Sequence, residues 1–519
     1  MRKLYSSFLL LSIFCLVPMV VCAAPRPQTE PNAASTLITG GVVIDGTGAK
    51  RRQADIRIVG GKIVAVGRLK AKIGERIISA KGLIVAPGFI DAHSHADGGL
   101  LEDPDAETQI RQGITTAVVG QDGGSHFPLK TWFDEVTAKG VALNVASFVG
   151  HGTVRGQAMG ADSSKPASPE QISRMKELTA QEMESGAVGL SSGLEYVPGR
   201  YSNTEELVAC AQVAGKYGGL YISHVRNEDN QAFDSFRELI RIADEGHLPA
   251  QISHIKLGSA SVWGKSKEVL KMMADARKRG LDITADVYPY LYWQSTIVVL
   301  IATEQWDNRA QWTKGLADVG GADHVLLSAY TPQPEWEGKT IAAIAALTQS
   351  DPVTVIQEIV KKTHSPGATG KEGVIVTAMS EPDLETFVAS PSIMFCSDGG
   401  LHGTHPRGAG SFPRVLAHYV RERKILTLEA AIHKMTGLTA QRMGLSDRGV
   451  LAAGKAADLV LLDPATVQDT ATTAQPTSPP QGIPTVFVNG VLVLENGQVT
   501  GAHPGLILKR GSLGREKKK

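Results

Sequence analysis

The stretch "GLIVAPGFIDAHSH", residues 82–95, is an apolar run that ends in two histidines. His93 and His95 are two positions apart, so in an extended strand both side chains point to the same face. Imidazole is a common zinc ligand, and two on one face can begin a metal site. A histidine at a strand end can equally be an ordinary solvated residue. The ends of the other strands decide between these interpretations.

Seven further apolar runs that end in polar residues follow in the middle of the chain. They are residues 115–122, 143–152, 187–196, 219–228, 249–256, 282–290 and 392–400. Helix-like stretches separate several of them, and these end at or near a glycine, as in residues 169–186 and 203–218. Strands that alternate with helices predict a parallel sheet. Eight such units favour a (β/α)8 TIM barrel, with a doubly wound open sheet as the alternative.

The two ends of the chain have a different pattern, with short β-rich runs separated by glycine turns. It covers residues 36–86 and 441–505, and includes the hairpin signal Asn489-Gly490. Because chain ends often lie close together, we predict that both segments build one small β-sandwich domain beside a barrel at 87–440. Residues 291–391 are predicted to be an insertion over one face of the barrel, where long excursions often serve as lids or specificity elements.

The chain termini carry separate signals. Residues 1–24 have a basic start, an apolar stretch and small residues at the end, which predicts a signal peptide and export to the periplasm or medium rather than lipidation. Residues 25–35 are a Pro-rich linker, and residues 506–519 a basic tail. The formal net charge of +1 gives no electrostatic reason to expect nucleic acid or stable membrane attachment as a partner, and the oligomeric state is left open.

In a TIM barrel the active site lies at the carboxyl ends of the strands. The candidate residues at those ends are His93, His95, Asp122, His224, His254 and Asp398. All are ligand types for a divalent metal, and histidines suit zinc. Such a set, arriving on independent strands at one rim, predicts a metal site.

Four motifs in this order, "PGFIDAHSH", "ISHVRNE", "ISHIK" and "CSDGG…HPRGAGSFPRVLAHYVRE", resemble the metal-dependent amidohydrolase superfamily, and most closely its D-aminoacylase (N-acyl-D-amino-acid deacylase) family. The resemblance runs from about residue 36 to 500. It implies Zn2+, as one or two ions, with His93 and His95 at one position and His224 and His254 at the other. It further implies a metal-bound hydroxide, with Asp398 as acid/base, that cleaves the linear amide of N-acyl-D-amino acids or of dipeptides containing a D-residue.

One position departs from that family. D-aminoacylases typically carry "GNCG" after the second strand, with a cysteine ligand, whereas this chain has "GQDGG" with Asp122 in its place. Asp122 is therefore the candidate bridge between two metals, or else a turn residue. A carboxylate is a harder ligand than a thiolate, so divalent metals other than zinc stay open.

The resemblance also points to substrate-binding residues, namely Tyr196, Arg226, Lys256, Tyr288 and Arg407. Cationic side chains suit the carboxylate of an N-acyl amino acid, and a tyrosine hydroxyl can donate to a developing oxyanion. Structural salt bridges at the barrel rim are the alternative for these charges. Two other functions remain: a cyclic amidase of the dihydroorotase or hydantoinase type, and a catalytically impaired metal-binding homologue.

Overall fold

The computed structural model describes residues 35–509, apart from 302 and 304. The predicted signal peptide, linker residues 25–34 and tail residues 510–519 lie outside the described residues. Among the residues it describes, no helix is long and apolar enough to cross a membrane.

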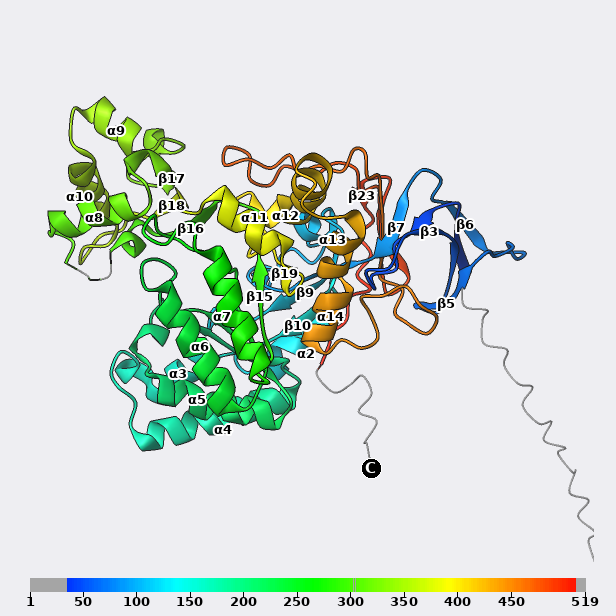
Figure 1. Cartoon of the computed structure of the whole chain (residues 1–519), viewed down its shortest axis with the longest axis horizontal. Helices are drawn as coiled ribbons and strands as arrows, with labels where there is room; N and C mark the ends of the chain where they lie inside the picture. Colours follow the sequence, from blue (N-terminus) through cyan, green and yellow to red (C-terminus); the bar gives the residue numbers. More distant parts are fainter. Residues whose placement is uncertain (1–34, 302, 304, 510–519) are drawn as a thin grey trace, which may run out of the picture.

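Within the described part of the chain, eight parallel strands form the predicted TIM barrel (Figure 1). They are β8 (Phe89–Asp91), β9 (Ile114–Val119), β10 (Asn144–Ser147) continued by β11 (Val149–Gly150), β12 (Gly189–Gly193), β13 (Leu220–His224), β14 (Ala250–Ile252), β15 (Ile283–Val287) and β19 (Ile393–Phe395). Strands β8 and β19 meet just beyond their carboxyl ends, where Asp398 N donates to His93 O at 2.9 Å. Every strand predicted for the barrel is present, so the barrel is confirmed.

Helices cover the outside of this barrel. They include α1 (Glu107–Ile110), α2 (Leu129–Lys139), α3 (His151–Met159), α4 (Pro169–Ser185), α5 (Thr204–Lys216), α6 (Ala232–Gly246), α7 (Ser266–Lys278), α11 (Glu381–Ala389), α12 (Arg407–Arg414), the π-helical Val415–Glu422, α13 (Leu428–Met435) and α14 (Gly437–Met443). Helix α4 begins with a capping box between Ser168 and Gln171 and ends at left-handed Gly186. Helix α6 instead ends at left-handed His247, one residue past the expected glycine.

The N- and C-terminal segments together build the predicted β-sandwich. One sheet has the order β5-β4-β1-β6 and the other β23-β22-β21-β20-β7-β2-β3. Their bounds are β1 (Ser35–Thr39), β2 (Val42–Val43), β3 (Arg52–Gln53), β4 (Asp55–Val59), β5 (Lys62–Gly67), β6 (Arg76–Ser79), β7 (Ile84–Pro87), β20 (Leu459–Leu462), β21 (Thr485–Val488), β22 (Val491–Glu495) and β23 (Gln498–Val499). Ile56 and Val85 from the N-terminal segment pack with Leu459 and Phe487 from the C-terminal one.

The run at 82–95 belongs to both domains. Its first half is β7, which pairs with β20 in the sandwich, and its second half is β8 of the barrel. The junction is Gly88, where a Cβ atom would lie 2.3 Å from Thr115 Cγ2. Glycine therefore allows the chain to pass close to β9 as it enters the barrel.

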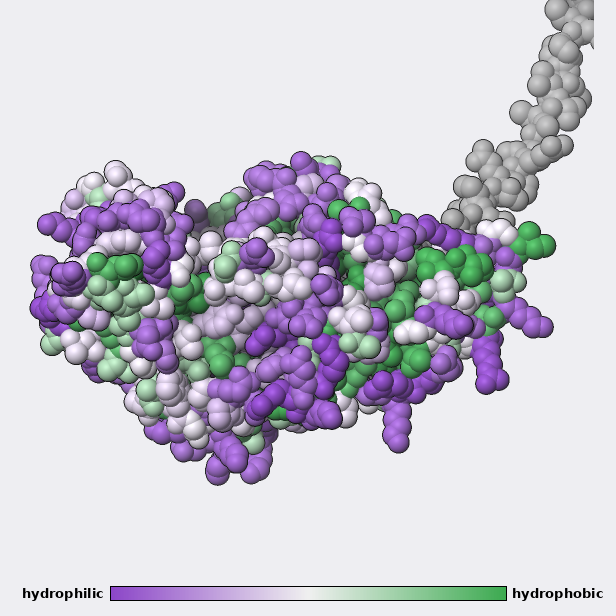
Figure 2. Space-filling view, turned by 90° about the horizontal axis from the view of Figure 1, so that it is seen from above, coloured by the Kyte–Doolittle hydropathy of each residue, from purple (hydrophilic) through white to green (hydrophobic). Residues whose placement is uncertain are grey.

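The insertion after β15 is a small domain with its own core. Strands β16 (Tyr292–Ser295), β17 (Val325–Tyr330) and β18 (Glu372–Thr377) form an antiparallel sheet, which the sequence did not predict. Helices α8 (Arg309–Asp318), α9 (Ile341–Thr348) and α10 (Pro352–Thr363) pack with it around buried Trp312. Figure 2 shows this lobe set off by a notch from the rest of the molecule.

Two predicted boundaries need correction. Helix α11 packs against barrel helix α7, so the insertion ends before residue 381 rather than at 391. The basic tail also starts later than residue 506, because residues 506–508 lie along β10, where Val145 N donates to Leu506 O at 2.9 Å. Backbone pairing with a buried barrel strand orders these residues.

Candidate metal centre

Asp122 lies at the centre of the predicted ligand set, in the loop after β9. Its Oδ2 is 3.2 Å from His95 Nε2, and its Oδ1 is 3.4 Å from His93 Nε2 and 3.5 Å from His254 Nε2. The Nδ1 atom of His224 is 3.1 Å from His254 Nε2. The structure therefore brings histidines from three strand ends around the carboxylate of Asp122, which follows a fourth strand.

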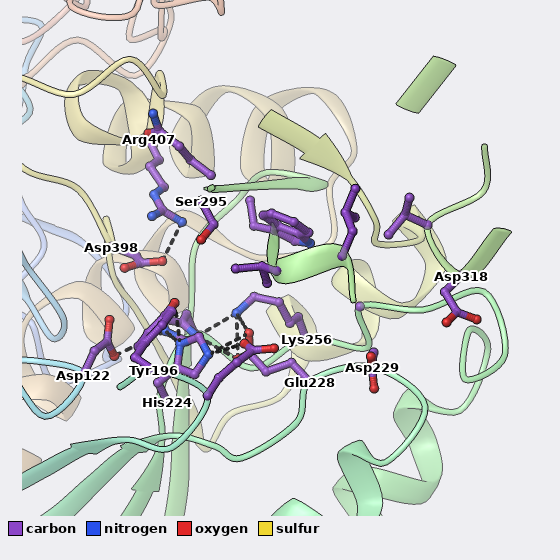
Figure 3. A pocket seen from close by; sticks show the side chains of 18 of the residues that line it. Asp122, Tyr196, His224, Glu228, Asp229, Lys256, Ser295, Asp318, Asp398 and Arg407 are labelled. Atoms are coloured by element: carbon purple, nitrogen blue, oxygen red, sulfur yellow. Dashed lines mark hydrogen bonds and ion pairs between the residues drawn. The ribbon is translucent and has the colours of Figure 1, made fainter. Parts of the chain in front are cut away.

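Asp398 completes the set from the end of β19. Its Oδ1 is 3.2 Å from His95 Nε2 and 3.5 Å from His93 Nε2, and its Oδ2 is 2.6 Å from Arg407 Nη1 (Figure 3). Burial opposes ionisation of this carboxyl, but the Arg407 guanidinium and neighbouring His254 outweigh burial and hold the pKa of Asp398 well below its usual range. A carboxylate rather than a carboxylic acid therefore faces the histidines.

Three of these residues have unusual backbone conformations. Asp122, His254 and Asp398 have φ angles of 53°, 33° and 49°, in the left-handed region that non-glycine residues rarely adopt. Such conformations cost free energy and are concentrated at functional sites. Each lies two or three residues beyond the end of its strand, which is β9, β14 or β19, at the mouth of the barrel.

The side chains present fit a divalent metal. Two groups that share Asp122 have ligand atoms within 4.8 Å of one another: His93, His95, Asp122 and Asp398, and Asp122, His224 and His254. Among the described residues, the ring nitrogens of fully buried His93 and the Oδ1 atom of Asp122 have no hydrogen-bond partner. Buried polar atoms are normally paired, so an ion would satisfy atoms that the chain leaves unpaired.

Two carboxylates approach the histidines from the outside. Glu195 Oε2 is 2.8 Å from His224 Nε2, and Glu228 Oε1 is 3.1 Å from His254 Nδ1. In both rings these nitrogens are opposite the ones that face the ligand cluster. Carboxylates in this position fix the tautomer of a metal-binding histidine and raise its basicity.

The site opens into a cavity of about 380 Å³ at the barrel mouth, with the insertion as one wall. Three of the residues predicted to bind substrate line this cavity, namely Tyr196, Lys256 and Arg407. The lining from the insertion comprises Trp293, Gln294, Ser295, Val299, Leu300, Gly315, Asp318 and Val319. The insertion thus contributes directly to the shape of the cavity.

Tyr288 and Arg226 differ from the other predicted substrate residues. Tyr288 is buried beside the cavity, with its ring 5.0 Å from Arg407 Cζ, and its hydroxyl has no hydrogen-bond partner among the described residues. Burial raises the pKa of this tyrosine to about 12, so the hydroxyl keeps its proton. Arg226 lies outside the cavity lining, where its Nε and Nη2 atoms each donate to Glu238 at 2.9 Å. The structure thus gives Arg226 the rim salt bridge that was its alternative.

The comparison with known proteins agrees with this geometry. The model of the amidohydrolase family matches residues 76–494. The chain belongs to the amidohydrolase family. D-aminoacylase of Alcaligenes xylosoxydans xylosoxydans is 35% identical, over 93% of this chain and 99% of the relative. N-acyl-D-glutamate deacylase of the same organism is 37% identical, over 91% and 96%.

Solved structures of similar proteins share the fold of this amidohydrolase, and two of them concern bound metals. A crystal structure of D-aminoacylase matches with a TM-score of 0.80 at 34% identity, over 92% of this chain and 100% of that one. N-acyl-D-glutamate deacylase from Bordetella bronchiseptica, complexed with zinc and a phosphonate inhibitor, matches with a TM-score of 0.81 at 34% identity over the same shares. Another similar D-aminoacylase structure concerns a binuclear metal centre. The expectation of zinc agrees with these relatives and with the donor set.

Sequence reasoning missed the outer carboxylates of this amidohydrolase. Glu195 lies next to Tyr196 in "GLEY", and Glu228 lies two residues after Arg226 in "HVRNE". Glu195 follows the fourth barrel strand, β12, and reaches His224. The sequence signal for both carboxylates is that each lies one or two positions from a predicted site residue.

Proposed function

We propose that this amidohydrolase hydrolyses the linear amide bond of N-acyl-D-amino acids and releases a carboxylate and a free D-amino acid. The observation that carries the proposal is the placement of Asp398 between the histidine cluster and Arg407, within one cavity. Three relatives at 34–37% identity are a D-aminoacylase, an N-acyl-D-glutamate deacylase and an N-acyl-D-aspartate deacylase. The preference for D-stereochemistry rests on these relatives.

His224, His254 and Asp122 would hold one zinc ion, and His93 and His95 would hold a second, with Asp122 shared between them. When bound, zinc polarises a carbonyl and lowers the pKa of coordinated water toward about 7. Glu195 and Glu228 orient the two histidines of the first position through their outer nitrogens.

Asp398 is the acid/base of the proposed reaction. Its carboxylate accepts a proton from the attacking water as the water oxygen bonds to the carbonyl carbon. The same proton then passes to the amide nitrogen as the carbon–nitrogen bond breaks, and the amine leaves. The ion pair with Arg407 keeps Asp398 ionised for the first of these steps.

Arg407 and the tyrosines bind the substrate. Arg407 uses one nitrogen for Asp398, and the rest of its planar fork can donate to the substrate's carboxylate. Tyr196, whose hydroxyl lies 3.3 Å from His224 Nδ1, and Tyr288 with its unpartnered hydroxyl can donate to negative charge on the carbonyl oxygen.

A substrate panel tests the proposed function. The zinc-loaded protein is assayed with N-acetyl-D-amino acids, their L-enantiomers, and a hydantoin and dihydroorotate as cyclic amides. We expect hydrolysis of the N-acetyl-D-amino acids in preference to the other two classes. Preferential opening of a cyclic amide would instead support the cyclic amidase, and inactivity toward every amide would support the impaired homologue.

We also propose that the protein is exported. The support is the sequence of residues 1–24 alone, with its basic start at Arg2 and Lys3 and its small residues Ala23 and Ala24. N-terminal sequencing of protein recovered from the host's periplasm or medium tests it. A mature chain that begins near residue 25 is expected, and an intact Met1 in the cytoplasm would contradict it.

A further inference from the structure

The cavity carries far more negative than positive side-chain charge. Its cationic side chains are Lys256 and Arg407, and its carboxylates are Asp122, Glu195, Glu228, Asp229, Asp318 and Asp398. Both cations are already paired, Arg407 with Asp398 at 2.6 Å and Lys256 with Glu228 at 2.7 Å. Even two divalent ions would leave no positive charge in excess, so a second negative charge on the substrate finds little compensation here.

The uncompensated charge lies away from the histidines. Figure 3 shows Asp229 and Asp318 on the side of the cavity opposite Asp122 and Asp398. Asp318 forms an ion pair with Lys314, whereas no cationic side chain in the described part of the chain forms an ion pair with Asp229. Burial, together with the nearby Glu195 and Asp318, raises the pKa of Asp229. A cation placed beside Asp229 would relieve this repulsion.

The cavity is a ligand site on grounds independent of these carboxylates. Behind the lining residues Asp122 and Asp398, the fully buried His93 directs its Nε2 atom at both carboxylates, and this atom has no hydrogen-bond partner among the described residues. The lining of the cavity also includes apolar atoms, contributed by Trp293, Val299 and Leu300 of the insertion. Methylene groups can pack on such atoms while a terminal cation reaches a carboxylate.

We propose that the preferred substrates are N-acyl-D-amino acids with a long cationic side chain, such as lysine, ornithine or arginine, and that Asp229 determines this specificity. The inference rests on the proposed deacylase function and adds the side-chain class. With the scissile amide at the histidine cluster, the aliphatic stem lies along the apolar lining and the ammonium or guanidinium contacts Asp229. The same charge distribution disfavours substrates with an acidic side chain, such as the N-acyl-D-glutamate and N-acyl-D-aspartate after which two of the relatives are named.

Matched substrates test the inference. The zinc-loaded protein is assayed with Nα-acetyl-D-lysine, Nα-acetyl-D-norleucine, which has the same carbon chain without the ammonium, and Nα-acetyl-D-glutamate. We expect kcat/KM for lysine to exceed that for norleucine by about tenfold or more, as a charge-assisted hydrogen bond provides, and glutamate to be the poorest. A kcat/KM for norleucine or glutamate equal to or above that for lysine overturns the inference and leaves the deacylase function intact. No hydrolysis of any of the three overturns both.

A variant assigns the effect to its residue. In Asp229→Asn the lysine-to-norleucine ratio of kcat/KM should fall by about tenfold, because the amide has the shape of the carboxylate without its charge. Asp134→Asn, on the exposed face of α2 and outside the cavity lining, is the control and should keep the wild-type ratio. Circular dichroism establishes that both variants are folded. An unchanged ratio in folded Asp229→Asn overturns the assignment of specificity to this residue.

Discussion

Arg407 and Asp398 form the closest ion pair of the candidate active site, with Nη1 of the guanidinium 2.6 Å from Oδ2 of the carboxylate. Asp398 Oδ1 meanwhile faces the histidines at 3.2 and 3.5 Å. One carboxylate thus joins the ligand cluster to the cationic wall of the cavity. The two oxygens of Asp398 therefore have different roles. Arg407 binds Oδ2, and Oδ1 faces the site of proton transfer.

Replacement of Asp398 by asparagine should remove the acid/base while its shape is kept. We expect kcat to fall by about 10²- to 10⁴-fold, the usual contribution of general acid–base catalysis. Metal analysis should still find the ion held by His224, His254 and Asp122, since these ligands are unchanged. Hydrolysis at the wild-type rate would exclude Asp398 from the mechanism.

Arg407→Met should raise KM and lower kcat together. KM rises because the donors for the substrate carboxylate are lost, and kcat falls because Asp398 loses the cation that keeps it ionised. Steady-state kinetics separate the two effects. Arg226→Met is the matched control, because Arg226 pairs with Glu238 outside the cavity, and it should change KM little. A large rise of KM in Arg226→Met, with little change of KM in Arg407→Met, would instead place the binding site for the substrate carboxylate at Arg226.

Loss of a residue that hydrogen-bonds to a metal ligand typically lowers metal affinity by about 10- to 100-fold. Asp122→Ala should weaken zinc binding by more than this. The reason is that the Asp122 carboxylate lies within 3.5 Å of His93, His95 and His254. Metal content after dialysis against a chelator measures the loss. Asp122→Cys restores the cysteine typical of D-aminoacylases and should recover zinc. Full metal stoichiometry in Asp122→Ala would mean that Asp122 is a turn residue.

Glu195→Gln should lower zinc affinity by about 10- to 100-fold. Glu195 accepts a hydrogen bond from His224 Nε2, which leaves Nδ1 unprotonated toward the ligand cluster, and an amide does this less well. Competition with a zinc-binding dye measures affinity independently of turnover. Glu177→Gln, on the exposed surface of α4, controls for the loss of one charge. If both variants bind zinc with equal affinity, Glu195 lines the cavity but does not contribute to zinc binding through His224.

The β-sandwich should show a pH-dependent contribution to stability from Glu75. The Arg57 guanidinium lies 2.6 Å away and lowers the Glu75 pKa to about 2, against 4.5 for the free group. A lowered folded-state pKa stabilises the fold above the unfolded value, and this stabilisation is lost as pH falls from about 4.5 toward 2. Glu75→Gln should therefore lower Tm at pH 7, with a difference from wild type that shrinks toward pH 3.

A surface pair provides the control for that measurement. Arg76 and Glu495 are about half exposed and form an ion pair at 2.6 Å. Solvent screening makes such pairs weak, so Glu495→Gln should change Tm little at either pH. A pH-independent effect of Glu75→Gln would show that packing rather than charge explains it.

The barrel and its ligand set could be predicted because their signals are local. An apolar strand followed by a polar residue is visible in "GFIDAHSH", "ISHVRNE" and "ISHIK", and the topology of a barrel brings strand ends to one rim whatever the loops do. The sandwich was predictable for a similar reason, since its short β-rich runs and the glycine turns between them are visible in the sequence itself. The sheet in the insertion was not predicted, because β17 and β18 are separated by two helices and pair only through tertiary contacts.

The sequence by itself determined the strand order, the metal-binding residue types and the place of Asp398 at the end of the last barrel strand. Only the tertiary structure decided that Asp122 lies among three histidines, that Glu195 and Glu228 face the outer nitrogens of two of them, and that Arg226 turns away to Glu238. The physical reason is distance: hydrogen bonds and ion pairs act over about 3 Å, and residues far apart in the chain reach that separation only when packing fixes the backbone.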